Sequence, residues 1–537
     1  MKTTMRKGVA ALAAAAVTSL TACAGIDDGA DEASFGYLVS TPLVTTNAGT
    51  LEGRSTQAQL LSTALYPGVY VPGPQGQMIP NTDLVTTQEL PGPERRVNYS
   101  LSQEAVFSDG TPVTCSDYLL AFTAGTHPAL FGSSMPLFDD TAQLTCTPGS
   151  KDFTVIFKEG RGARWRGLFE AGTVLPAHAV AKQLELSVDE LVEELESEDA
   201  DRLRPIADVW RGSFNLDNFD EELQTSFGPY TIDRVGDDGE VVLRANEHYY
   251  GDAPAEPEIV VWPGSADAGA LAESGELVVG DLRDHTPEWF DSNAEDNRLE
   301  VSTVAGQLTE VLQFPEVGTW AVEENRQALS RCIDPRAVAD AASSAAGIAV
   351  PVAPLHVLQN DDPLAKRLDD AVQPRLDVDV ERARALEGAE VRIGYAYPSK
   401  RYAAMVEAMR RSCEPAGVTI VDATGDGKSL ADLPRAEIGE WGEEVAADGT
   451  IDAFIYPADP MTSFPAALNK ADNLGVLRAQ EIFLWDRLPT IPLIAQPVTF
   501  AIDREVSNVV AYTGLSGIGW NVNRWQRGDH PTHKDET

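Results

Sequence analysis

Short segments in which apolar and polar residues alternate predict β-strands along the chain. These segments are residues 97–101, 152–158 and 241–243 in the first half and 391–397, 417–421 and 451–456 in the second half. Helices are predicted from a different spacing. Ser187 and Glu190 form a capping box, and the apolar residues that follow recur at the 0, 3, 4, 7 positions of a helix face.

The order of elements in the second half predicts parallel strands. A strand at 391–397 is followed by a helix after Ser399, in which Tyr402, Met405, Val406 and Met409 share one face, and then by a strand at 417–421. Strand, helix and strand at this spacing form a βαβ unit. Residues 310–500 are therefore expected to be an α/β domain, whereas residues 70–170 are richer in β-structure.

Length and charge exclude several classes of protein. A chain of 537 residues allows two to four domains at roughly 100–200 residues per domain. It has 43% hydrophobic and 23% charged residues, which are ordinary values for a globular protein. The 41 Lys and Arg against 83 Asp and Glu give a net charge of −42, which argues against a nucleic-acid partner because such binders need a basic surface.

The N-terminus has the features of a bacterial lipoprotein signal. Residues 1–22 begin with three cations and continue in an uncharged, Ala-rich run that is too short to span a bilayer. Leu20-Thr21-Ala22-Cys23 matches a lipobox, in which the thiol of Cys23 receives diacylglycerol. Residues 23–33 then form a lipidated polar tether, and the protein is expected on the outer face of the cell membrane. The alternative is a soluble protein with a cysteine at this position by coincidence.

Four cysteines remain once Cys23 is assigned to lipid. They are Cys115, Cys146, Cys332 and Cys413. An even number outside the membrane favours two disulfides, and sequence order favours Cys115 with Cys146 and Cys332 with Cys413. Free buried thiols are the alternative.

No motif for catalysis or metal binding is found. The sequence contains no HExxH, CxxC or GxSxG motif, and of the seven histidines only His530 and His533 are close together, in a polar tail. Gly427-Lys428-Ser429 imitates the end of a phosphate loop, but Asp422 stands where that motif requires glycine. We therefore predict that the protein is not an enzyme and needs no cofactor or metal.

Six blocks, in the same order, resemble the family 5 solute-binding proteins of ABC importers. They are residues 106–122 (VFSDGTPVTCSDYLLAF), 153–178, 227–251 (FGPYTIDRVGDDGEVVLRANEHYYG), 325–338 (NRQALSRCIDPRAV), 452–464 and 488–500. Each block alone is weak, but together they cover almost all of the mature chain.

This resemblance implies an α/β, bilobal periplasmic-binding-protein fold of type II, cluster C, with an extra third domain. Domain I would combine residues 34–70, 171–309 and 501–537, domain II would be 71–170, and domain III would be 310–500. A monomer would close its two lobes on a ligand and present the closed form to a membrane permease.

A cleft of this kind needs aromatic walls and a few polar anchors. The candidates are Tyr37, Trp262, Tyr395, Tyr397 and Asp459. Peptide-binding members of the family use an Asp in an "AD…P" segment to hold the α-ammonium of the ligand. Here Ala458-Asp459-Pro460 lacks two residues between the Asp and the Pro, which weakens the expectation of amine recognition. Ordinary core packing is the alternative for each aromatic residue.

A further resemblance is to the LpqW-type lipoproteins of actinobacteria, which bind a monoacyl phosphatidylinositol tetramannoside. It rests on TTNAGT at 45–50, on residues 66–84 and on the Cys115 and Cys146 pair. It implies a glycolipid headgroup as ligand and a membrane mannosyltransferase as partner in lipomannan and lipoarabinomannan assembly. The other hypotheses are the peptide-binding subunit of an ABC importer and a scaffolding lipoprotein without a small ligand.

Overall fold

A large mixed sheet runs through the computed structural model, which describes residues 34–73, 77–282, 287–294, 297–439, 441–464 and 473–528. The predicted signal peptide, Cys23, the tether and the pair His530 and His533 lie outside the described residues. None of the described helices is both long enough and apolar enough to cross a bilayer.

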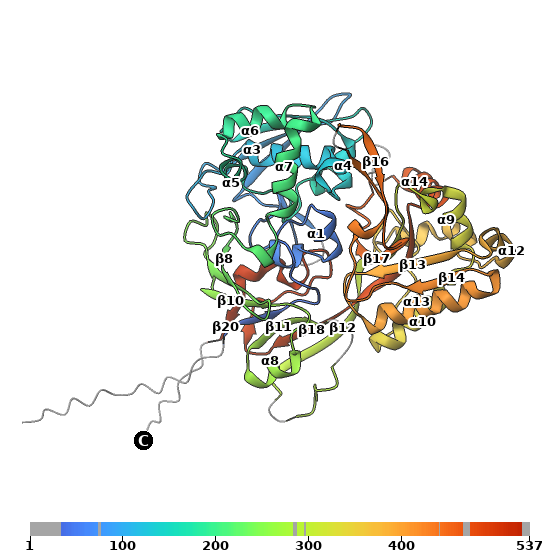
Figure 1. Ribbon diagram of the computed structural model, residues 1–537. Coiled ribbons are helices and arrows are strands. Elements are labelled where there is room, and N and C mark those ends of the chain that lie inside the picture. The colour runs from blue at the N-terminus through green and yellow to red at the C-terminus, as the bar shows by residue number, and fades with distance from the viewer. Residues whose placement is uncertain are drawn as a thin grey trace, which may run out of the picture. The chain divides into compact units, whose positions relative to one another are not determined.

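The order of the ten strands does not follow the chain (Figure 1). From one edge to the other the sheet contains β14 (Thr419–Asp422), β13 (Glu390–Tyr395), β17 (Ala453–Ala458), β12 (Leu299–Gln313), β18 (Thr490–Asp503), β11 (Leu277–Leu282), β1 (Gly36–Leu38), β10 (Glu258–Trp262), β9 (Val241–Ala245) and β8 (Tyr230–Val235). Pairing is parallel for β14–β13–β17 and for β11–β1–β10, and antiparallel elsewhere.

Two large hydrophobic cores lie along this sheet. The first core is built by residues between 35 and 279 together with residues 498–525, and the second core by residues between 312 and 494. Strands β12 and β18 connect the two: Val498 and Phe500 belong to the first core, whereas Leu312 and Ile491 belong to the second. These two strands are therefore the covalent links between the parts of the chain that the cores organise.

An irregularity in the β12–β18 pair marks the crossing between the cores. Ala305 pairs with Pro497, but the next pair is Thr309 with Ala495, so β12 bulges between these positions. Gly306 lies in the bulge, where an added Cβ would come within 2.9 Å of the Gln496 carbonyl oxygen. Pro497, which pairs with Ala305 beside the bulge, has no N–H group to donate to the neighbouring strand. The hydrogen bonding between β12 and β18 is therefore interrupted at this point of the sheet.

A second sheet lies within the first core. It is antiparallel, in the order β4 (Val85–Leu90), β5 (Arg96–Leu101), β7 (Asp152–Phe157) and β6 (Thr141–Thr145). The predicted strands at 97–101 and 152–158 are confirmed as β5 and β7. Rings from this sheet and from helix α3 (Cys115–Thr126) pack closely: Phe153 lies 4.7 Å from both Tyr99 and Tyr118.

Asp117 joins two of the sequence blocks on which the family resemblance rests. One carboxylate oxygen accepts a hydrogen bond from Thr114 N at 2.8 Å, and the other accepts one from Ala177 N at 2.8 Å, where α5 (Ala177–Gln183) begins. Burial raises the pKa of Asp117 to about 6 although these hydrogen bonds oppose the shift. The two blocks are thus parts of one structural unit.

The predicted βαβ unit is confirmed in the second core. Strands β13 and β14 are parallel, and they are joined by α13 (Lys400–Cys413), which Ser399 caps by accepting from Tyr402 N. The strand predicted at 417–421 begins later, at Thr419, because Gly417 has a φ of 74° and ends the preceding turn of helix. α13 packs beside α10 (Pro335–Ala346), as Figure 1 shows.

Two disulfides occur in the structure. One links Cys115 at the start of α3 to Cys146, and the other links Cys332 to Cys413 at the end of α13. These are the pairings that sequence order favours. Each bond lies within one core, so neither ties the two cores together.

The remaining helices and strands are short or peripheral. The helices are α1 (Leu51–Ser55), α2 (Gln59–Ser62), α4 (Pro128–Phe131), α6 (Val188–Leu195), α7 (Ala200–Gly212), α8 (Ala268–Ser274), α9 (Glu323–Ser330), α11 (Asp369–Val372), α12 (Val380–Ala383) and α14 (Leu474–Arg487). The strands are β2 (Tyr70–Pro72), β3 (Met78–Pro80), β15 (Arg435–Ile438), β16 (Glu444–Ala447), β19 (Val506–Ser507) and β20 (Gln526–Arg527). The capping box predicted at Ser187 and Glu190 is confirmed at the start of α6.

Candidate functional site

Polar side chains and main-chain groups from the two cores meet in one region, which we call the seam. On the side of the first core it contains Arg54, Ser55, Gln59, Arg164 and Glu170, and on the side of the second core Val357, Gln359, Leu430, Asp459, Pro460, Thr462, Ser463 and Phe464. Several hydrogen bonds cross it directly. Leu430 N, for example, donates to Ser55 Oγ at 2.8 Å.

Helix α1 places Arg54 at the seam. Thr50 caps the helix by accepting from Gly53 N at 2.8 Å, and a Cβ at Gly53 would come within 2.0 Å of the Asn47 carbonyl oxygen. Only glycine therefore allows this tight turn. The helix that starts after the TTNAGT segment directs Arg54 toward Ser463, to which its Nη2 donates at 2.7 Å.

Glu170 is the buried anion next to Arg54. Its Oε2 lies 3.8 Å from Arg54 Nη1 and accepts a hydrogen bond from Gln59 Nε2 at 3.0 Å. Burial raises the pKa of Glu170 and the nearby Asp459 raises it further, whereas Arg54 and the hydrogen bonds lower it. Arg54 and Glu170 thus form an ion pair at 3.8 Å that is largely shielded from water.

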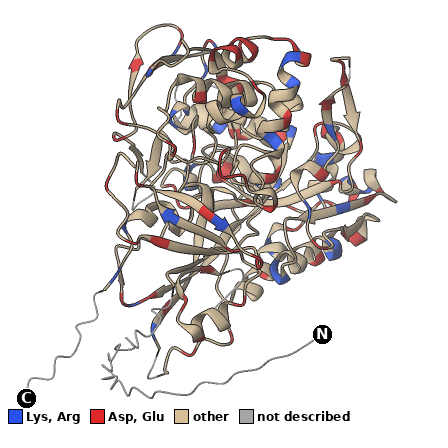
Figure 2. Cartoon of the chain, turned by 60° about the vertical axis from the view of Figure 1, so that its left-hand side comes forward, with Lys and Arg blue, Asp and Glu red and all other residues tan. Residues whose placement is uncertain are grey.

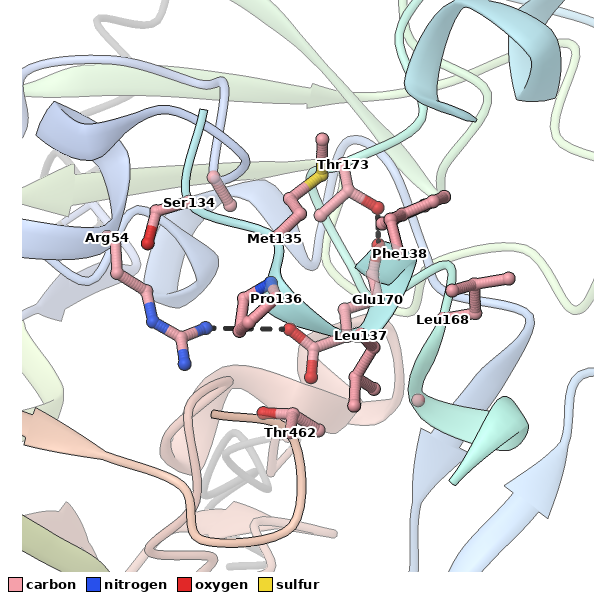
Figure 3. A pocket seen from close by; sticks show the side chains of 12 residues that line it. Arg54, Ser134, Met135, Pro136, Leu137, Phe138, Leu168, Glu170, Thr173 and Thr462 are labelled. Carbon is pink, nitrogen blue, oxygen red and sulfur yellow. Dashed lines mark hydrogen bonds and ion pairs between the residues drawn. The ribbon is translucent and has the colours of Figure 1, made fainter. Parts of the chain in front are cut away.

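A small pocket with a cavity volume of about 20 Å³ lies beside this pair (Figure 3). Its lining is formed by Ala48, Arg54, Ser134, Met135, Pro136, Leu137, Phe138, Gly167, Leu168, Glu170, Thr173 and Thr462. In the close-up, Arg54 and Glu170 face each other and Thr462 approaches from the other core. The pocket therefore combines a mostly apolar wall with one cation, one anion and hydroxyl groups.

Two buried polar atoms at the pocket have no hydrogen-bond partner among the described residues, namely Arg54 Nε and Thr462 Oγ1. A buried polar atom without a partner is costly, by about 1–3 kcal/mol. A ligand that offers an acceptor to Arg54 and a hydroxyl to Thr462 would remove this cost. The arrangement is therefore suited to binding a polar group.

Asp459 lies at the seam, but its carboxylate accepts hydrogen bonds from within the second core. Its Oδ1 accepts from Met461 N at 2.9 Å and from Gln359 Nε2 at 3.1 Å. These bonds hold the loop that follows β17, from which Thr462 and Ser463 reach the first core. Asp459 thus shapes the seam and adds negative charge to it.

The four aromatic candidates do not line this pocket. Tyr37 on β1 packs edge-on to Trp525 at 5.1 Å in the first core, and Trp262 at the end of β10 packs against a smaller apolar cluster. Tyr395 donates to Asp422 Oδ2 at 2.6 Å, and Tyr397 packs near Tyr402 in the second core. The physical reason is that each ring lies on or beside a strand of the sheet, where its apolar surface packs in a hydrophobic cluster. Their role as cleft walls stays a prediction that the pocket does not support.

The sequence did not reveal Arg54, Arg164 or Glu170. A single arginine among 41 cations has no local feature that marks it as buried, and the same holds for one glutamate among 83 acidic residues. The one local signal was Thr50, the last residue of TTNAGT, which caps the helix that contains Arg54.

Among the described residues, no group of three His, Cys, Asp or Glu side chains could hold a metal ion. Several charged groups of the seam make hydrogen bonds to main-chain atoms or to neighbouring side chains.

A protein-family model decides the relationship of the chain. Residues 81–459 match the model of the bacterial extracellular solute-binding proteins, family 5. The chain belongs to this family.

Two mycobacterial lipoproteins are similar to this chain over most of its length. An uncharacterized lipoprotein of Mycobacterium tuberculosis is 30% identical over 96% of this chain and 96% of its own length, and one of Mycobacterium leprae is 26% identical over 94% and 95%. The oligopeptide-binding protein OppA of Mycobacterium tuberculosis is 30% identical over only 24% of this chain.

Solved structures of family 5 proteins share the fold. The oligopeptide-binding protein AppA of Bacillus subtilis, in complex with a nonapeptide, matches with a TM-score of 0.62 at 12% identity, covering 93% of this chain and all of that one. A periplasmic EDTA-binding protein, EppA, matches with a TM-score of 0.62 at 15% identity over 92% and 96% of the two chains. The predicted α/β periplasmic-binding-protein fold is therefore confirmed.

Proposed function

We propose that this family 5 protein is a lipid-anchored binder that holds the hydroxyl-rich headgroup of a glycolipid at the seam. The single observation that supports this ligand class is the pocket beside Arg54 and Glu170. There a cation and an anion lie together, and Arg54 Nε and Thr462 Oγ1 lack partners.

The charge balance of the pocket favours a neutral ligand surface. A sugar hydroxyl is both a donor and an acceptor, so it can donate to the Glu170 carboxylate while a neighbouring oxygen accepts from Arg54 Nε. Hydrogen bonds to ionised groups are about twice as strong as neutral ones, and both members of the pair can make them. The apolar wall formed by residues such as Met135 and Leu168 then covers the ring carbons.

The crossing at β12 and β18 supplies the motion that such binding needs. The pocket, at about 20 Å³, has room for about one water molecule, whereas ligand pockets are typically about 300–1,000 Å³. A headgroup of several sugars therefore requires the seam to separate. The bulge at Gly306 and the proline at 497 are where the strands can bend, so that domain III (310–500) moves against the rest of the chain.

The proposed location is the outer face of the cell membrane, with Cys23 as the lipidated residue. Two full-length relatives are named lipoproteins, which agrees with this position. A headgroup binder anchored in the same membrane meets its ligand in two dimensions. We place the protein with the LpqW-type lipoproteins in phosphatidylinositol mannoside, lipomannan and lipoarabinomannan assembly, with a membrane mannosyltransferase as partner.

The second candidate function is the peptide-binding subunit of an ABC importer with a membrane permease as partner. It is favoured by Asp459, which lies in the segment that holds the ligand ammonium in peptide-binding members, and by the local similarity to OppA. Against it stands the internal engagement of Asp459 Oδ1 by Met461 N and Gln359.

A thermal-shift comparison separates these two functions. A binder's melting temperature rises with ligand concentration by mass action. Phosphatidylinositol mannosides should raise the melting temperature of the mature chain, whereas trialanine and longer peptides should not. Stabilisation by peptides alone would reject the glycolipid function in favour of import.

A further inference from the structure

Arg164 reaches from the first core into the second. It precedes the short 3-10 helix Trp165–Gly167, and Trp165 belongs to the first core. Its guanidinium donates to three main-chain carbonyl oxygens of the second core: Nη1 to Pro460 O at 2.5 Å and to Phe464 O at 2.8 Å, and Nη2 to Val357 O at 2.6 Å. We call these three oxygens the carbonyl cage.

The guanidinium is deeply buried without a close carboxylate. Arg164 is only 6% exposed, and no acidic group of the described residues lies within ion-pair distance of it. Burial lowers the pKa of Arg164 to about 10, while Asp459, Asp140 and Glu481 oppose the shift from a distance. The carbonyl cage and the surrounding acidic residues therefore stabilise the charge of the Arg164 guanidinium in place of a paired carboxylate.

Such a cage has the chemistry of a binding site for an organic cation. Carbonyl oxygens converge on one point, as they do around ammonium groups and metal cations, and the acidic residues add charge of the right sign. The loop that supplies two of the oxygens begins at Asp459. In the second core alone, this cage would be open toward the first core.

Glu481 fixes the third wall of the cage. Its carboxylate accepts from His356 N and Val357 N and lies 2.8 Å from His356 Nδ1, so the segment that carries Val357 O is rigidly held. The position of Val357 O is thus fixed by the second core itself.

We propose that the carbonyl cage is a cation-binding subsite of the seam and that Arg164 is its built-in occupant. Arg164 then determines specificity, because a ligand with an ammonium or guanidinium end finds the subsite filled. It also closes the two cores on each other without any ligand. The consequence for ligand choice rests on the proposed function, but the subsite itself can be tested without the natural ligand.

Chemical rescue tests the subsite directly. The variant Arg164→Ala removes the occupant, and the small cations ethylguanidinium and ethylammonium are added at 1–10 mM, about the range in which a weak subsite would fill. We expect Arg164→Ala to melt lower than the wild type and to regain several degrees with ethylguanidinium. The wild type should gain nothing.

Arg166→Ala is the matched control. Arg166 is two residues away, exposed, and stacked on Trp165 at 4.6 Å, so its loss removes the same charge without opening the cage. Its melting temperature should not respond to either cation. A folded Arg164→Ala variant that shows no rescue, or an equal response from Arg166→Ala, would overturn the proposal.

Arg164→Met is a second test variant in case the alanine variant is poorly folded. It keeps an apolar side chain at position 164 but leaves the three carbonyl oxygens of the cage without a cation. Trialanine, which has a free ammonium, should therefore bind this variant at least tenfold more tightly than N-acetyl-trialanine. Equal affinity for the two peptides, or no binding of either, would contradict the subsite. A failure of the glycolipid function in the thermal-shift comparison would leave both of these results unchanged.

Discussion

Arg54 on α1 and Glu170 beyond the 3-10 helix at 165–167 face each other across 3.8 Å, and both side chains are largely buried. Arg54 also holds Ser463 of the second core, so this one side chain joins the ion pair, the pocket and the seam. Acidic residues elsewhere are interspersed with fewer basic ones along most of the described helices and loops (Figure 2).

Removal of Arg54 should destabilise the protein more than removal of the pair. Arg54→Met leaves Glu170 buried without its cation, which should cost about 3 kcal/mol of the free energy of unfolding. In Arg54→Met/Glu170→Gln the remaining group is neutral, so part of this loss should be recovered. Urea unfolding at pH 7 measures both.

An exposed ion pair provides the control for this cycle. Arg478 lies 2.6 Å from Asp370, whose side chain is 74% exposed, and Arg478→Met should cost less than about 1 kcal/mol. Strict additivity of the two seam substitutions would show that Arg54 and Glu170 are not coupled.

Stability should depend on pH through Asp281, a buried residue of β11. Burial raises the pKa of Asp281 to about 7, whereas the hydrogen bond from Ser40 Oγ opposes the shift. The folded state therefore keeps the proton while the unfolded state releases it near pH 4. The stability of the neutral form is complete below pH 4 and is lost as the pH rises to 7, by up to about 1.4 kcal/mol per pH unit.

Asp281→Asn should abolish this dependence, because the amide stays neutral throughout. Its free energy of unfolding should fall less between pH 4.5 and pH 7 than that of the wild type. Asp448→Asn, at an exposed position, should keep the wild-type slope. If Asp281→Asn also keeps it, the carboxyl is ionised in the folded protein.

Local patterns were sufficient to predict much of the fold. The capping residues Ser187 and Ser399 and the strands β5, β7 and β13 depend on neighbours within a few residues, which the sequence displays. The order of the ten strands depends on pairings between residues far apart, such as Glu300 with Ile502, and no local pattern of the sequence displays it.

The site was harder to predict for the same reason. Asp459 was found because a motif marks it. Arg54, Arg164 and Glu170 come from three separate segments, and they acquire their role only when the two cores meet. The aromatic candidates were chosen by residue type alone, and type does not distinguish a ring such as Tyr37 in a core from a ring in a cleft.

Gly306 should be required for the bulge at the crossing between the cores. In Gly306→Ala the added Cβ meets Gln496 O at 2.9 Å and Thr513 Cβ at 3.0 Å, and such overpacking costs about 1–3 kcal/mol. Gly212→Ala, in α7 with open space around it, should instead be neutral or stabilising. Thermal unfolding of the two variants compares them, and equal melting temperatures would show that the bulge tolerates a side chain.

Cys23→Ala should release the mature chain from membranes. Without the thiol there is no acceptor for diacylglycerol, and a single change of this kind leaves residues 34–528 untouched. Fractionation of cells into membrane and soluble parts measures the outcome. Unaltered retention in the membrane fraction would mean that another feature holds the protein there.

Hydrogen exchange with and without a phosphatidylinositol mannoside tests the central claim most directly, because it locates the ligand on the chain. We predict new protection in residues 48–60, 164–173 and 456–464, which form the pocket and the seam, and in the crossing at 303–309. Protection confined to other segments, or none at saturating glycolipid, would contradict the assignment of the seam as the ligand site.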